Sequence, residues 1–149
     1  MVTDTPASNT EVVLRFIELI NNWNWDAVPE VIDPNNYVEN NPAWGAIGFE
    51  QMRQTYEMVR AALPDLTFTS DMDLIVAEGD KVVIRGTVSG THAGADLFGV
   101  PASGKRVAWT GTDVSRVVNG KIVERWLNAD IMGLLQQLGL APGPGSEQA

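Results

Sequence analysis

The sequence predicts an α+β domain in which N-terminal helices pack on a mainly antiparallel sheet. Two patterns predict this class: apolar residues recur at steps of three and four up to about residue 63, and from residue 66 they alternate. The chain has 149 residues, of which 44% are hydrophobic and 19% charged, values typical of one globular domain. Because the helices precede the strands, we expect two separate layers.

Two helices are expected before residue 33. The first covers residues 9–22, where Ser8 and Glu11 have the spacing of a capping box. The second is short: "AVPEVI", residues 27–32, follows Asp26, a favoured N-cap residue, and its proline is tolerated in the first helical turn.

A long polar and aromatic loop, residues 33–48, precedes the third helix. This helix starts at Phe49 and carries apolar side chains at steps of three and four as far as Leu63, where Pro64 stops it.

Four longer strands follow. Alternation on the first strand places on one face Phe68, Ser70, Met72, Leu74 and Val76. Alternation on the second strand groups Val82, Ile84, Gly86 and Val88, and His92 joins them if the strand continues. A glycine-rich connection then leads to a strand over residues 106–118. "NG" at 119–120 makes a tight hairpin into residues 121–130, and a last helix, residues 131–138, ends at Gly139.

The composition excludes several classes of function. A net charge of −9 argues against nucleic acid or an anionic membrane as a partner. With no Cys and one His, the chain lacks the usual ligands of a zinc site, and no G-x-S-x-G motif presents a nucleophilic serine. No apolar run approaches the roughly 20 residues of a membrane helix, and no secretory leader is recognisable, so a cytoplasmic location is expected. Acid–base chemistry by carboxylates remains.

Five tryptophans are many for a domain of this size. A strongly twisted sheet over helices leaves a conical cavity, and some of these rings could line a pocket for a flat or apolar ligand; alternatively they fill the core. The rings are those of Trp23, Trp25, Trp44, Trp109 and Trp126.

Four segments carry a resemblance to a known family: "YVENNPAWG", "LPDLTFTSDMDLIVAEGDKVVIRGTVSGTHAG", "LFGVPASGKRV" and "VVNGKIVERWLNADIMGLLQQLG". They resemble the SnoaL-like polyketide cyclases, the ester-cyclase branch of the NTF2-like superfamily, from Glu11 to Gly139. Two positions depart from the pattern of many relatives: Asn40 and Arg125 each replace a histidine.

The resemblance implies an NTF2-like cone over residues 9–140, in which N-terminal helices and a curved mixed, mainly antiparallel sheet enclose a pocket. Residues 1–8 and 141–149 are expected to be flexible tails. It also implies a homodimer packed through the outer face of the sheet. The expected activity is aldol ring closure in an aromatic or polycyclic polyketide of antibiotic biosynthesis, a pathway of secondary metabolism. No metal or organic cofactor is expected, and the acid/base position falls on Asp130.

Asp130 has two interpretations. If the strand persists, Trp126, Asn128 and Asp130 share one face, where an apolar pocket would suit a carboxylate base. Alternatively, Asp130 is the N-cap of the helix that starts at Ile131. We take the catalytic role as the hypothesis.

Further site residues are expected around the cavity. His92 is a candidate catalytic residue or a structural loop residue. Asp113, alternating with Trp109, is a second pocket acid or a partner of Arg116, Arg125 or Arg85 on the outer face. The remaining candidates for binding substrate are Tyr37, Asn40, Trp44, Trp109, Arg125 and Trp126.

Two other functions are open. Water addition resembling that of the limonene-epoxide hydrolases needs an "R-x-D" pair on one strand, but Arg85 is followed at that spacing by Thr87. The other is a non-catalytic ligand-binding module, which the same fold also supports.

Overall fold

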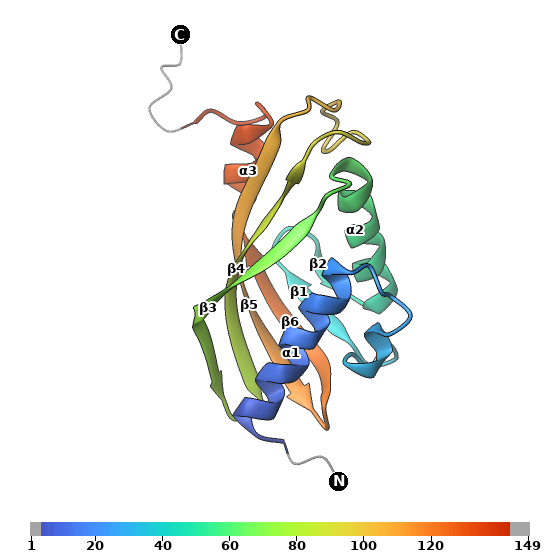
Figure 1. The fold of residues 1–149 in the computed structure, drawn as a ribbon, viewed down its shortest axis with the longest axis vertical. Helices are drawn as coiled ribbons and strands as arrows, with labels where there is room; N and C mark the ends of the chain where they lie inside the picture. The colour runs from blue at the N-terminus through green and yellow to red at the C-terminus, as the bar shows by residue number, and fades with distance from the viewer. Residues whose placement is uncertain (1–3, 144–149) are drawn as a thin grey trace.

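The computed structural model describes residues 4–143 and shows three helices and one short 3-10 turn packed on a curved, unclosed sheet of six strands (Figure 1). The helical elements are α1 (Pro6–Asn21), η1 (Val28–Glu30), α2 (Phe49–Ala62) and α3 (Ile131–Gln137). The strands are β1 (Val38–Asn41), β2 (Gly45–Ile47), β3 (Thr67–Glu78), β4 (Lys81–Thr91), β5 (Arg106–Val118) and β6 (Lys121–Ala129). Residues 1–3 and 144–149, the outer parts of the two expected tails, lie outside the described residues.

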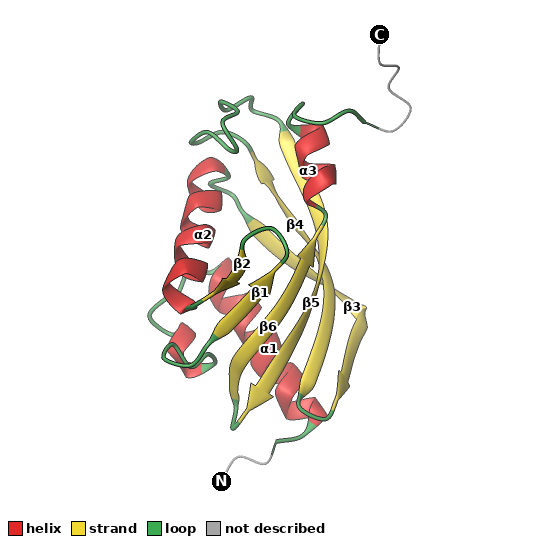
Figure 2. Ribbon diagram, turned by 180° about the vertical axis from the view of Figure 1, so that it is seen from behind, coloured by secondary structure: helices red, strands yellow, loops and turns green. Residues whose placement is uncertain are grey.

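The strand order is β2-β1-β6-β5-β4-β3, with every neighbouring pair antiparallel except β1 and β6. The expected α+β class and mixed, mainly antiparallel sheet are therefore confirmed. α1 runs diagonally across one face, and α2 lies beside the β1–β2 hairpin on the same side (Figures 1 and 2). Within residues 4–143, no helix combines the length and the apolar character needed to cross a membrane.

The first helix begins earlier than its pattern predicts. Thr5, not Ser8, is the N-cap: its side chain accepts from the Ser8 N–H at 3.1 Å, and the Ser8 hydroxyl accepts from the Thr5 N–H at 2.9 Å. The capping box therefore lies one turn upstream, and Pro6 occupies the first helical turn, where its missing N–H costs nothing.

The expected loop at residues 33–48 is wrong in part, because it contains β1 and β2. Both strands are short and polar, and β1 is held by a parallel pairing with β6, some 85 residues away in the chain. Local periodicity carries no signal for a pairing of this kind.

A bulge in β3 overturns the predicted face of that strand. Ser70 pairs with Gly86 but Ile75 pairs with Ile84, so three extra residues lie on the β3 side. The bulge changes which side chains face the helices, as an irregularity in a period of two must. Phe68 and Ile75 pack on the core, whereas the outer surface carries Met72, Leu74 and Val76, all well exposed. The expected homodimer through the outer face stays a prediction.

A second bulge lies in β6. The β5–β6 register shifts by one residue at Val123. In a regular strand, Ile122 would share a face with Asp130 and not with Arg125. The extra residue reverses this, and Ile122 and Arg125 are both buried on the inner side. Arg125, Leu127 and Ala129 line the cavity, whereas the alternate set, including Trp126, does not.

The last turns follow the sequence. Asn119 and Gly120 have φ values of +51° and +75°, the left-handed pair of a tight hairpin. Gly139, at φ +78°, follows the C-cap of α3 as predicted.

Candidate active site

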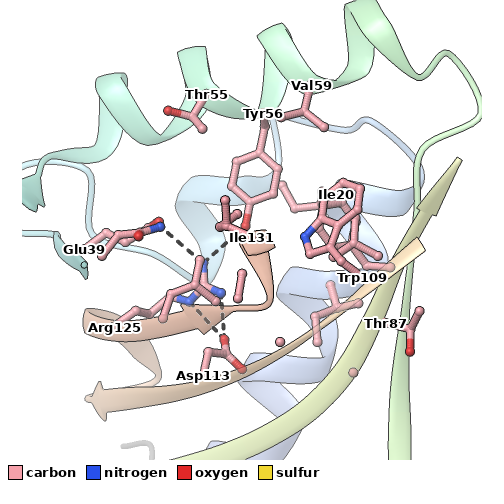
Figure 3. Close-up of a pocket in the computed structure, with 18 of the residues that line it drawn as sticks. Ile20, Glu39, Thr55, Tyr56, Val59, Thr87, Trp109, Asp113, Arg125 and Ile131 are labelled. Carbon is pink, nitrogen blue, oxygen red and sulfur yellow. Dashed lines mark hydrogen bonds and ion pairs between the residues drawn. The ribbon is translucent and has the colours of Figure 1, made fainter. Parts of the chain in front are cut away.

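A cavity of about 170 Å³ lies between α1, α2 and the concave face of the sheet. Its walls are mostly apolar and come from both helices, β3 to β6 and the start of α3. The charged side chains of the lining gather in one place, where Arg125 lies among Glu39, Asp113 and Tyr56 (Figure 3). We call these four residues the Arg125 cluster.

Arg125 is the centre of the cluster and is buried. Its Nη2 and Nε donate to the same Asp113 oxygen, Oδ2, at 2.6 and 3.1 Å. Its Nη1 donates to the Tyr56 hydroxyl at 3.3 Å and lies 3.7 Å from Glu39 Oε2. The guanidinium also stacks 5.1 Å from the ring of Phe16. Burial acts to lower the pKa of Arg125, but Tyr56, Tyr37, Asp113 and Glu39 outweigh it and hold that pKa well above its usual value.

Both tyrosines of the chain belong to this region. Tyr37 is buried behind Glu39 and donates to Glu39 Oε2 at 2.9 Å. Burial, the largest cause, raises the pKa of Tyr37 and of Tyr56 above the ordinary value. Tyr56 therefore keeps its proton, and since its oxygen accepts from Arg125, that proton is available to a ligand in the cavity.

We expect that neither Tyr37 nor Tyr56 ionises near pH 10 in the folded protein. In the unfolded chain both should titrate near a pKa of about 10. Because each pKa is raised on folding, the stability contribution of these groups is complete below about pH 10 and is lost as the pH rises further. The ultraviolet absorbance of tyrosinate measures this. A native step near pH 10, matching that of guanidinium-unfolded protein, would contradict it.

Alternation along β1 decides which loop candidates reach the cavity. Glu39 and Asn41 line it, whereas Asn40 points to the other side and donates to Glu124 Oε2 at 3.1 Å and to the Arg125 carbonyl at 3.3 Å. Tyr37 does not line the cavity either; it supports Glu39 from behind. Asn40 points away from the cavity because residues 38–41 form a strand rather than a loop. A role for Tyr37 and Asn40 in binding substrate stays a prediction, for which the cavity lining gives no support.

Asp130 is exposed and outside the cavity lining. Its Oδ1 accepts from the Gly133 N–H at 2.9 Å, which confirms the N-cap interpretation for α3. The one-residue bulge at Val123 gives it this position, since it turns Trp126 and Asp130 to the outer side. A catalytic role for Asp130 stays a prediction, for which this geometry gives no support.

His92 is fully buried and does not line the cavity. One ring nitrogen, Nε2, lies 3.0 Å from the Ala95 carbonyl, and the backbone of His92 bonds Lys105 and Gly104. These contacts close the base of the connection between β4 and β5, so the structure supports the structural alternative for His92.

Four candidates do line the cavity: Trp44, Trp109, Asp113 and Arg125. Asp113 faces inward, not outward, and of its three candidate partners it has Arg125. Arg85 instead pairs with Asp71 at 2.6 Å on the exposed surface, so β4 carries no Arg–acid pair of the epoxide-hydrolase kind.

Sequence reasoning missed Glu39 and Tyr56. Tyr56 is in the apolar helical pattern of α2 and reads as a core residue there, while Glu39 lies in the expected loop. Knowing that residues 38–41 form a strand would have placed Glu39 and Asn40 on opposite faces, so that only one of them could face the cavity. Within residues 4–143, no group of three or more His, Asp or Glu side chains is arranged to hold a metal ion.

Comparisons with known proteins agree with this architecture. The family model of the SnoaL-like polyketide cyclases matches residues 10–138. AclR from Streptomyces galilaeus, a proposed hydroxylase, is similar with 29% identity and a TM-score of 0.83. The matched region covers 93% of this chain and 85% of the AclR chain. IdmH from Streptomyces antibioticus, a proposed polyketide cyclase, has 28% identity and a TM-score of 0.79, covering 88% and 98%. TsrD from Streptomyces laurentii has 30% identity and a TM-score of 0.78, covering 93% and 99%. No curated protein sequence matches the chain.

Proposed function

Because the chain belongs to the SnoaL-like polyketide cyclase family, we propose that it closes a ring in a polyketide ester by intramolecular aldol condensation. One observation carries the proposal: a charged, hydrogen-bonded cluster lies inside a cavity whose other walls are largely apolar. Such a cavity suits an aromatic or polycyclic molecule, and the cluster supplies the groups that move its protons.

Asp113 is the base in this proposal. Arg125 occupies its Oδ2, while the described residues provide no hydrogen bond to Oδ1. Of the two cluster carboxylates, Asp113 is the more open to the cavity, with 12% of its side chain exposed against 5% for Glu39. Oδ1 can therefore take a C–H proton from a bound substrate. A carbon between two carbonyls is acidic enough for one modest base.

Tyr56 and Arg125 stabilise the charge that forms. As Asp113 takes the proton, the electron pair of the C–H bond stays on the substrate and an enolate forms. The enolate oxygen accepts a hydrogen bond from the Tyr56 hydroxyl. The enolate carbon then attacks a second carbonyl carbon, a C–C bond forms, and the new alkoxide takes the proton back from Asp113. Arg125 keeps a positive charge beside the developing anion throughout, a stabilisation that is strong because Arg125 is buried.

The test is the appearance of a new chromatographic peak, together with its mass. A polyketide methyl ester with an unreacted β-keto ester side chain should give a product of unchanged mass, or one lighter by a single water if the aldol product dehydrates. Liquid chromatography with mass spectrometry measures it, with boiled protein as the blank. If a panel of such esters returns unaltered, the proposal is wrong.

A second function has one observation in its favour. Arg125 lies between two carboxylates, Asp113 at 2.6 Å and Glu39 at 3.7 Å, and such a pair can supply a base and an acid for the addition of water. The substrate of this reaction is an epoxide. One carboxylate would take the proton of the attacking water, while the other, protonated, would give a proton to the oxygen of the opened epoxide. With an epoxide substrate in place of the ester, a product heavier by one water identifies this reaction.

A further inference from the structure

Two exposed aromatic rings from separate turns meet at the edge of the cavity. Trp44 lies in the β1–β2 turn and Phe98 in the connection between β4 and β5, and both line the cavity. Their ring centroids are 6.5 Å apart and their planes differ by 18°. With 43% and 38% of their surfaces exposed, they face solvent on one side and the cavity on the other.

Phe98 is held in an unfavourable backbone conformation. Its φ is +48° and that of Gly99 is +79°, while Leu97 and Val100 exchange two backbone hydrogen bonds of 3.0 and 2.9 Å. A two-residue turn of this kind favours Asn, Asp or Gly at its first position, so a bulky ring there is uncommon. Leu97 is buried and anchors the turn, but the Phe98 ring is not packed in the core. Strain without a packing reason points to a role for the ring.

The turn that carries Trp44 is also held by hydrogen bonds. The Asn41 carbonyl accepts from the Trp44 N–H at 3.1 Å, and the Asn41 side chain accepts from the Ala43 N–H at 2.9 Å. Gly45 follows at φ +83° and completes the turn. Hydrogen bonds thus hold the backbone of both turns, which places the two rings at the cavity edge.

The aromatic pair, Trp44 and Phe98, and the Arg125 cluster lie at different ends of the cavity. β1 runs parallel to β6, with Asn40 beside Trp126, so Trp44 lies further along β6 than Arg125. The cavity between them, about 170 Å³, is smaller than the roughly 300–1,000 Å³ of typical ligand sites. A molecule of two or three fused rings whose reacting end lies at Arg125 therefore extends to the edge, where Trp44 and Phe98 are.

We propose that Trp44 and Phe98 select substrates with an extended planar ring system by stacking on the ring furthest from the reacting carbon. The inference rests on the proposed function for the end at which the reaction occurs. An aromatic contact of this kind is expected to change affinity by about 3- to 10-fold for each ring.

Isothermal titration calorimetry with two probes tests the proposal without turnover. The three-ring probe is 1,2-dihydroxyanthraquinone, and the one-ring probe is cyclohexane-1,3-dione. Trp44→Leu and Phe98→Leu keep apolar bulk but remove the flat surface. Each should weaken the anthraquinone by about 3- to 10-fold and leave the one-ring probe unchanged. Trp44→Phe and Phe98→Tyr should restore most of the affinity, and Met72→Ala, exposed on the outer face, should change neither.

Two results would overturn the proposal: no binding of the anthraquinone to the native protein, or equal binding by the native protein and both leucine variants. Neither depends on the product assay. A chain that binds the three-ring probe through these rings but returns every ester unaltered would instead refute the proposed function alone. Circular dichroism of each variant verifies that the fold is intact.

Discussion

Asp113→Asn is expected to lower the rate of ring closure by about 10²- to 10⁴-fold, the usual contribution of a general base. The amide keeps an oxygen for Arg125 but cannot take a proton. Because Arg125 and Glu39 then form a neutral pair, the variant should fold. Single-turnover kinetics with the product assay measure the rate, and the substrate dissociation constant should change little.

Asp130→Asn is the matched control. Asn is as good an N-cap as Asp, so α3 should keep its stability, and turnover should remain near that of the native protein. The reverse result, with Asp130→Asn inactive and Asp113→Asn active, would refute the role of Asp113 as the base. It would assign the acid/base to the position that the family resemblance implies.

Arg125→Met should be among the most destabilising single substitutions in the chain, with a loss of about 3–5 kcal/mol in the free energy of unfolding. The change leaves Asp113 and Glu39 as two buried carboxylates without their cation. Urea denaturation followed by fluorescence measures the loss. The comparison is Arg85→Met, whose partner Asp71 is equally close but exposed; there a loss of about 0–1 kcal/mol is expected.

A triple variant separates charge from shape. Arg125→Met combined with Asp113→Asn and Glu39→Gln removes all three charges, and should recover most of the lost stability without recovering activity. If Arg125→Met alone unfolds at the same urea concentration as the native protein, the cluster does not depend on this cation and the assignment of Arg125 as its centre fails.

Much of the fold could be predicted because its signals are local. The apolar repeat from Phe49 to Leu63, the Asn119–Gly120 hairpin and the terminal Gly139 each depend on a few neighbouring residues, and each appears where expected. The β1–β2 hairpin could not be found this way, since β1 exists through its pairing with β6.

The site was predicted in composition better than in orientation. Trp44, Trp109, Asp113 and Arg125 line the cavity, whereas Tyr37, Asn40, His92 and Trp126 do not, and Asp130 caps a helix. Glu39 and Tyr56 complete the cluster without any sequence signal of their own function.

The sequence by itself determined the positions of the three α-helices and the four longer strands, the absence of cysteine, and the expectation that a carboxylate is the acid/base. Only the tertiary structure decided which carboxylate faces the cavity. The physical reason is the period of two: one extra residue at Val123 turns Arg125 inward and Asp130 outward, and whether a bulge forms there depends on the pairing with β5.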